Sequence, residues 1–83
     1  MMKYEKRIRE IIAANLKTKI DIDDYDANGD LRNIGMNSIL FVSIVVAIEN
    51  EFGINFPDDK LLISEAGTIL LLNQILESII VNY

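Results

Sequence analysis

The chain contains no cysteine and no histidine among its 83 residues. Without cysteine there is no disulfide framework, thiol nucleophile or cysteine zinc site, and without histidine the commonest general base and transition-metal ligand is missing. The chain therefore lacks the residues that most classes of enzyme use in their chemistry. We expect a protein that performs no reaction of its own.

Positive charge is scarce as well. Eight Lys and Arg residues stand against 13 Asp and Glu residues, which gives a net charge of −5 and a pI near 4.5. Such a chain is repelled by phosphate backbones, and its aromatic residues are not interleaved with a basic patch, so nucleic-acid binding is excluded. The overall charge favours partners with basic surfaces.

Long apolar runs are absent, although 51% of the residues are hydrophobic. No run reaches the roughly 18 to 20 residues that span a bilayer. Residues 1–7 show neither the apolar region nor the cleavage site of a secretion signal. We expect a cytoplasmic protein with no membrane segment, and its length suits a single domain over residues 1–83.

Apolar residues at helical spacing predict three main helices. The first covers about residues 2–17, with an apolar face of Tyr4, Ile8, Ile11, Ile12 and Leu16, and with Lys3, Glu5, Lys6, Arg9 and Glu10 on its other sides. The second covers about 38–52, with a core stripe of Phe41, Ile44, Val45, Ile48 and Phe52. The third follows the capping residue Thr68 and covers about 69–81, with Ile69, Leu72, Ile75, Leu76, Ile79 and Ile80 on one face.

A short helical turn is expected at 58–63, after Pro57. Together these elements predict an all-α four-helix bundle of three main helices and one short helix. The segment from 18 to 37 has no periodicity and forms a long loop between the first two helices. Its candidate core contacts are Ile20, Ile22, Leu31 and Ile34.

This loop is rich in aspartate and resembles the first half of a calcium-binding EF-hand loop. Asp24, Asp26 and Asn28 stand at the first three ligand positions, but Gly35 occupies the position that needs a bidentate Glu. The favoured interpretation is a solvated acidic turn in which Asn28 and Gly29 reverse the chain. A partial calcium site of Asp24, Asp26 and Asn28 stays open as the alternative.

Ser38 stands where the second helix begins. Either Asn37 or Ser38 can cap this helix, and Gly53 can end it. A hydroxyl at a helix N-terminus lies where amide dipoles favour a phosphate. No histidine is available to activate Ser38, so it is not expected to be an enzyme's nucleophile, and the simplest interpretation is a helix cap.

Three further apolar residues, Ile39, Val42 and Val46, form a second stripe on this helix, on the side nearer Ser38. The core stripe already supplies the contacts that a helix in a small bundle needs. The second stripe is therefore either additional core or an apolar surface around the serine.

Nearly the whole chain resembles an acyl or peptidyl carrier protein. The resemblance is carried by Gly35-Met36-Asn37-Ser38-Ile39, the apolar helix after it, and the segment Glu-Asn-Glu-Phe-Gly-Ile-Asn-Phe-Pro-Asp-Asp at 49–59. In that family a serine at the start of the second helix is modified with phosphopantetheine by a transferase that uses coenzyme A. Ser38 occupies this place, flanked by Asn37.

The resemblance implies a carrier that holds an acyl or aminoacyl group as a thioester on the phosphopantetheine arm. It also implies as partners a phosphopantetheinyl transferase and the acyl- or aminoacyl-loading and condensing enzymes of fatty-acid, polyketide or nonribosomal-peptide synthesis. Carriers of this family are mostly monomers. The alternative is a small acidic calcium-binding or protein-interaction module in which Ser38 only caps a helix.

Four positions depart from the family's pattern. Asn37 and Ile39 replace the usual Asp and Leu beside the serine, and Leu40 and Ser43 stand where fatty-acid carriers have acids that meet basic enzymes. The expected partner surface, formed by Ile39, Val42 and Val46, is therefore less acidic and more apolar than in those relatives. This favours a stand-alone carrier for a specialised acyl or aminoacyl pathway.

Overall fold

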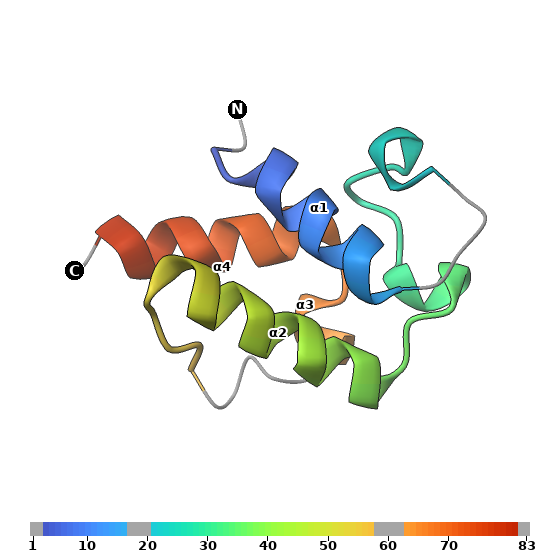
Figure 1. Cartoon of the computed structure of the whole chain (residues 1–83). Helices are drawn as coiled ribbons and strands as arrows, with labels where there is room; N and C mark the ends of the chain where they lie inside the picture. Colours follow the sequence, from blue (N-terminus) through green and yellow to red (C-terminus); the bar gives the residue numbers. More distant parts are fainter. Residues whose placement is uncertain (1–2, 17–20, 58–62, 82–83) are drawn as a thin grey trace.

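The computed structural model describes residues 3–16, 21–57 and 63–81 (Figure 1). Within these ranges the chain is helical and has no strand, as predicted. The elements are α1 (Glu5–Asn15), the 3₁₀ turns η1 (Ile22–Asp24) and η2 (Leu31–Ile34), α2 (Ser38–Phe52), α3 (Ile63–Ala66) and α4 (Ile69–Val81). The predicted bounds of the second and last helices are confirmed. No helix in the described ranges is long and apolar enough to cross a membrane.

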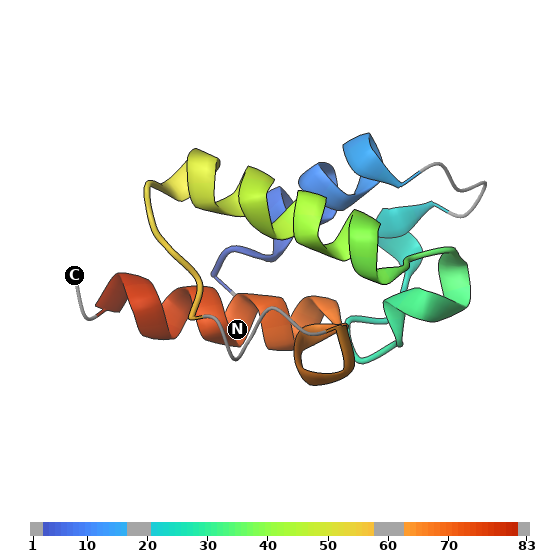
Figure 2. The same ribbon diagram turned by 90° about the horizontal axis from the view of Figure 1, so that it is seen from below.

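The three longer helices pack side by side. Figures 1 and 2 show α2 and α4 running in the same direction, with α1 antiparallel to both. Helix α1 contacts each of the other two. The connection that carries η1 and η2 lies at the end of the molecule where α2 and α4 begin. This arrangement brings the long loop next to the start of α2.

The predicted apolar faces meet in one core. Its members on the three longer helices are Ile8, Ile11 and Ile12 of α1, Phe41, Ile44, Val45 and Ile48 of α2, and Ile69, Leu72 and Leu76 of α4. Phe52, at the end of its predicted stripe, is only partly buried and meets the Tyr4 ring edge-on, with 5.3 Å between the centroids. Burial of these side chains is the main term that stabilises the fold.

Arg9 departs from its predicted place on the polar side of the first helix, because it is buried. Its guanidinium donates hydrogen bonds to the carbonyls of Ile22 (2.5 Å) and Tyr25 (2.7 Å) and pairs with Glu5 (2.8 Å). The loop folds back over α1 and supplies these carbonyls. A buried charge is tolerated only with such partners, which helical periodicity does not reveal.

Two predicted helices have different bounds. Helix α1 runs from Glu5 to Asn15, shorter at both ends than 2–17, and Leu16 is extended but buried. At its start the Tyr4 N–H donates to the side-chain oxygen of Asn73 (2.8 Å) on α4. Helix α3 begins at Ile63. The turn expected at 58–63 therefore lies, up to residue 62, outside the described residues, as does the predicted core contact Ile20.

The long loop is attached to the helices at several points. Ile22, Leu31 and Ile34 are buried, which confirms three predicted contacts. The N–H of Leu31 donates to the Gly67 carbonyl and the Ala27 carbonyl accepts from the N–H of Leu70, both at 2.9 Å. These bonds tie the loop to the start of α4.

Candidate functional site

The first turn of α2 is built around Asn37. Its backbone is extended (φ −132°, ψ 177°), and its side-chain oxygen accepts a hydrogen bond from the Leu40 N–H at 2.9 Å. Asn37 is therefore the N-cap, and Ser38 is the first residue of the helix proper. The interpretation in which Ser38 serves only as the cap is wrong, because its neighbour does that work.

The Ser38 side chain is exposed and makes no hydrogen bond to any residue that the structure describes. The buried side chains of Met36 and Phe41 anchor the chain on either side of it. Just before this segment, Gly35 ends η2 with φ at 104°, in the left-handed region that favours glycine. The fold thus presents an accessible hydroxyl between two buried side chains.

This position suits a phosphate ester. The first N–H groups of a helix lack partners within the helix and favour negative charge, so a phosphate on the Ser38 oxygen would lie in a favourable field. No imidazole or thiol exists in the chain to activate the hydroxyl. The serine therefore suits modification by a separate enzyme better than catalysis.

The second apolar stripe of α2 lies on the surface. Ile39 is 80% exposed, Val42 45% and Val46 46%. The interpretation of these residues as additional core is wrong. We call Ile39, Val42 and Val46 the outer stripe. Ser43 is exposed, and Leu40 is partly buried against the core.

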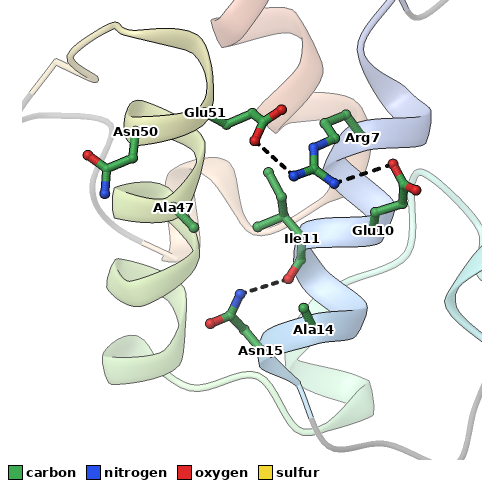
Figure 3. A pocket seen from close by; sticks show the side chains of 8 residues that line it. All are labelled: Arg7, Glu10, Ile11, Ala14, Asn15, Ala47, Asn50 and Glu51. Atoms are coloured by element: carbon green, nitrogen blue, oxygen red, sulfur yellow. Dashed lines mark hydrogen bonds and ion pairs between the residues drawn. The ribbon is translucent and has the colours of Figure 1, made fainter.

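A groove of about 420 Å³ lies between α1 and α2 (Figure 3). Arg7 spans it and pairs with Glu51 (2.8 Å) and Glu10 (3.6 Å). The hydrogen bond from Arg7 holds the pKa of Glu51 below its usual range. The groove meets α2 at Ala47 and beyond, which at 1.5 Å per residue is about 14 Å along the helix from Ser38. It is therefore separate from the serine.

Sequence reasoning did not find this groove or its ion pair. Arg7 and Glu51 are 44 positions apart in the chain, so only the packing of α1 on α2 brings them together. The pattern of residues around each of them carries no sign of the other.

The predicted acidic loop is organised by its own hydrogen bonds. The Asp26 side chain accepts from the Asn28 N–H (2.9 Å), and the N–H of Gly29 donates to the Asp26 carbonyl (2.8 Å), which is the predicted chain reversal. Asp30 pairs with Arg32 at 2.6 Å, and hydrogen bonds from Arg32 lower the pKa of Asp30. In the described ranges, Asp24 and Asp26 belong to no group of three His, Cys, Asp or Glu side chains that could hold a metal ion.

Two comparisons with known proteins indicate the family of the chain. Residues 6–72 match the model of a family described as phosphopantetheine attachment site. The chain is also 41% identical, over 56 residues, to an acyl carrier protein homolog of Mycoplasma genitalium. That alignment covers 68% of this chain and 66% of the relative, so the chain matches about two thirds of the relative's length.

The family model matches more than half of the chain, from α1 into α4, and includes the first turn of α2. The acyl-carrier relative leads to the same family. The chain therefore belongs to the acyl carrier protein family, whose cofactor is a covalently attached phosphopantetheine.

Proposed function

We propose that Ser38 receives the phosphopantetheine and that the chain presents an acyl or aminoacyl group to separate enzymes. The observation that supports this most is that Asn37, and not Ser38, caps α2. Asn37 caps the helix, so the exposed Ser38 hydroxyl has no structural duty in the first turn. A hydroxyl free of such duty is available for modification.

This chain contributes two things to the modification: the exposed position of the Ser38 hydroxyl and the electrostatic field at the N-terminus of α2. In the transferase reaction the Ser38 oxygen forms a bond to phosphorus, the adenosine bisphosphate portion of coenzyme A leaves, and the transferase accepts the hydroxyl proton. The dipole of α2 stabilises the negative charge of the resulting phosphodiester, typically by about 0.3 to 1 kcal/mol. The attached arm supplies a thiol on which an acyl group is held as a thioester.

The partner enzymes then act on the carried group, and this chain catalyses no step. The outer stripe is the proposed contact surface, because it lies on the same helix as Ser38 and exposes large apolar side chains. Leu40 and Ser43 leave this helix without the acids that basic fatty-acid enzymes meet. We therefore assign the chain to a specialised acyl or aminoacyl pathway rather than to fatty-acid synthesis proper.

The experiment is an intact-mass measurement after incubation with coenzyme A, magnesium and a broad-specificity phosphopantetheinyl transferase. The wild type is expected to gain one phosphopantetheine. Ser38→Ala is expected to gain none, whereas Ser43→Ala, which removes another exposed hydroxyl from the same helix, keeps the full gain. Modification that persists in Ser38→Ala, or no gain with any of several transferases, would refute the proposal.

A further inference from the structure

We infer that the surface around Ser38 selects partner proteins whose contact face is apolar and uncharged, with a hydrogen-bond acceptor opposite Asn37. This inference rests on the proposed function, because it names the kind of protein that meets Ser38. It also opposes the expectation from overall charge, which favours basic partners.

Helix α2 offers no free carboxylate along its entire described length. Its residues from 38 to 48 are all uncharged. The first acid, Glu49, accepts a hydrogen bond from the Phe56 N–H at 2.8 Å. The second, Glu51, is paired with Arg7 at 2.8 Å. Both acids of α2 are therefore used within the fold, at the end of the helix that is remote from Ser38.

Among the described residues, a group of exposed carboxylates lies on another element. Asp21, Asp23, Asp24 and Asp26 are exposed in and beside η1. Figure 1 shows η1 separated from the start of α2, with η2 between them. Interactions between exposed charges are strongly screened beyond about 8 Å at physiological salt. Among the described residues, this loop therefore carries the largest group of exposed acids, and the outer stripe carries none.

A basic partner face is disfavoured on this surface. A Lys or Arg placed against Ile39 or Val42 would lose water and gain no carboxylate in return. An apolar face has no such cost and gains from covering Ile39, which is 80% exposed. Because this part of α2 has no carboxylates, a basic partner face would bind it less tightly than an apolar face would.

The Asn37 side chain adds a hydrogen-bond donor with a fixed direction to this surface. Its side-chain oxygen is used by the Leu40 N–H at 2.9 Å, so its amide nitrogen is directed away from that bond. This nitrogen makes no hydrogen bond to the residues described, and Asn37 is exposed. A partner that covers it must supply an uncharged acceptor, such as a backbone carbonyl, or leave the donor unsatisfied.

The outer stripe by itself is too small to hold two copies of this chain in a stable dimer. A stable interface involves about 20 to 30 residues on each side, whereas the outer stripe has three. A small surface of this kind suits the brief encounters of a carrier with its enzymes. The partner is therefore a different protein with an apolar docking face.

The test compares two phosphopantetheinyl transferases, one with a basic carrier-binding surface and one with an apolar surface. The kcat/KM for modification of Ser38 is measured at about 50 and 500 mM NaCl, a range over which screening changes strongly. We expect the apolar-surface enzyme to be at least about tenfold more efficient on the wild type. Its rate is expected to change less than about twofold with salt, because charge pairs contribute little to this encounter.

Asn37→Asp is the decisive variant, because aspartate caps a helix as well as asparagine does. It removes the donor and adds a charge beside Ser38. We expect the basic-surface enzyme to gain severalfold in kcat/KM at low salt and to lose that gain at high salt. Asn50→Asp makes the same change at an exposed position near the other end of α2 and is expected to leave both enzymes unaffected.

The outcomes separate this inference from the proposed function. Faster modification by the basic-surface enzyme, or a wild-type rate that falls severalfold with salt, would overturn the inference and leave the carrier role intact. Equal effects of Asn37→Asp and Asn50→Asp would overturn it as well. If neither enzyme modified the folded wild type, which circular dichroism verifies, the proposed function would fail and the inference with it.

Discussion

Helix α2 presents two apolar faces, and the other helices cover only one of them. Phe41, Ile44, Val45 and Ile48 are at most 1% exposed, whereas the side chains of the outer stripe are 45 to 80% exposed. The same residue types occur on both faces: Ile44 is buried and Ile39 is the most exposed residue of the stripe. Identical side chains on one helix therefore have different energetic consequences.

The comparison separates stability from recognition. An isoleucine on the buried face contributes to folding because its surface leaves water when the helices pack. An isoleucine on the outer stripe stays in water when the chain folds and can be covered only by another molecule. Substitutions that are chemically equal on the two faces should therefore have unequal effects, and four predictions test this.

The largest difference is expected between Ile44→Ala and Ile39→Ala. Ile44→Ala leaves a cavity in the core and should lower the free energy of unfolding by about 2 to 5 kcal/mol. Ile39→Ala should change it by less than about 0.5 kcal/mol, since alanine also has the better helix propensity. Urea denaturation of both variants measures the two values. Equal destabilisation would show that the two faces are not energetically distinct.

The cap at Asn37 should have the next largest effect. Asn37→Ala removes the acceptor for the Leu40 N–H and should cost about 1 kcal/mol. Asn50→Ala, an equal substitution at an exposed position inside the helix, should be neutral or slightly stabilising. Ser38→Ala should change stability by less than about 0.5 kcal/mol, because Ser38 does not cap. A larger loss for Ser38→Ala than for Asn37→Ala would reverse the assignment of the cap.

Glu51 links α2 to α1 through its ion pair with Arg7, and the stability that this pair contributes should depend on pH. Arg7 lowers the pKa of Glu51 in the folded chain, so this stabilisation is complete above the unfolded pKa of about 4.5 and is lost as pH falls through the lower folded value. Glu51→Gln should therefore reduce the dependence of stability on pH below about 4.5.

Urea midpoints at a series of pH values measure this effect. Asp23→Asn removes an exposed loop carboxylate and serves as the control, which should retain the acid dependence contributed by Glu51. An unchanged pH profile in Glu51→Gln would show that the bond to Arg7 contributes nothing in solution.

The smallest effect on stability is expected on the outer stripe. Val46→Ser should change the free energy of unfolding by less than about 0.5 kcal/mol, because Val46 is already half exposed. Its modification by the apolar-surface transferase should nevertheless slow severalfold. Ala13→Ser, at an exposed position of α1, should leave both quantities unchanged. Wild-type rates for Val46→Ser and Val42→Ser would remove the stripe from the proposed contact surface.

Much of the fold could be predicted because it depends on local patterns. The 3.6-residue period located α2 and α4 and their buried faces, and short polar side chains marked both helix starts: Asn37 caps α2, and the Thr68 hydroxyl accepts from the Leu71 N–H at 3.0 Å. The candidate serine followed from the motif around it. What the pattern left open was which of Asn37 and Ser38 caps the helix.

The errors arose where distant segments meet. Arg9 fits a polar helix face by its type, but the carbonyls that bury it come from a loop 13 and 16 positions later. The ion pair between Arg7 and Glu51 and the hydrogen bond between Tyr4 and Asn73 join residues even further apart. Residue type and periodicity carry no information about such partners.

The sequence by itself determined the helical class, the two apolar faces of α2 and the place of Ser38, because helix periodicity, caps and motifs depend on neighbours within a few positions. Only the tertiary structure decided which apolar face is covered, which residue caps α2 and where the carboxylates are used. These outcomes depend on helices and loops that pack from distant parts of the chain, and their contacts exist only in the folded molecule.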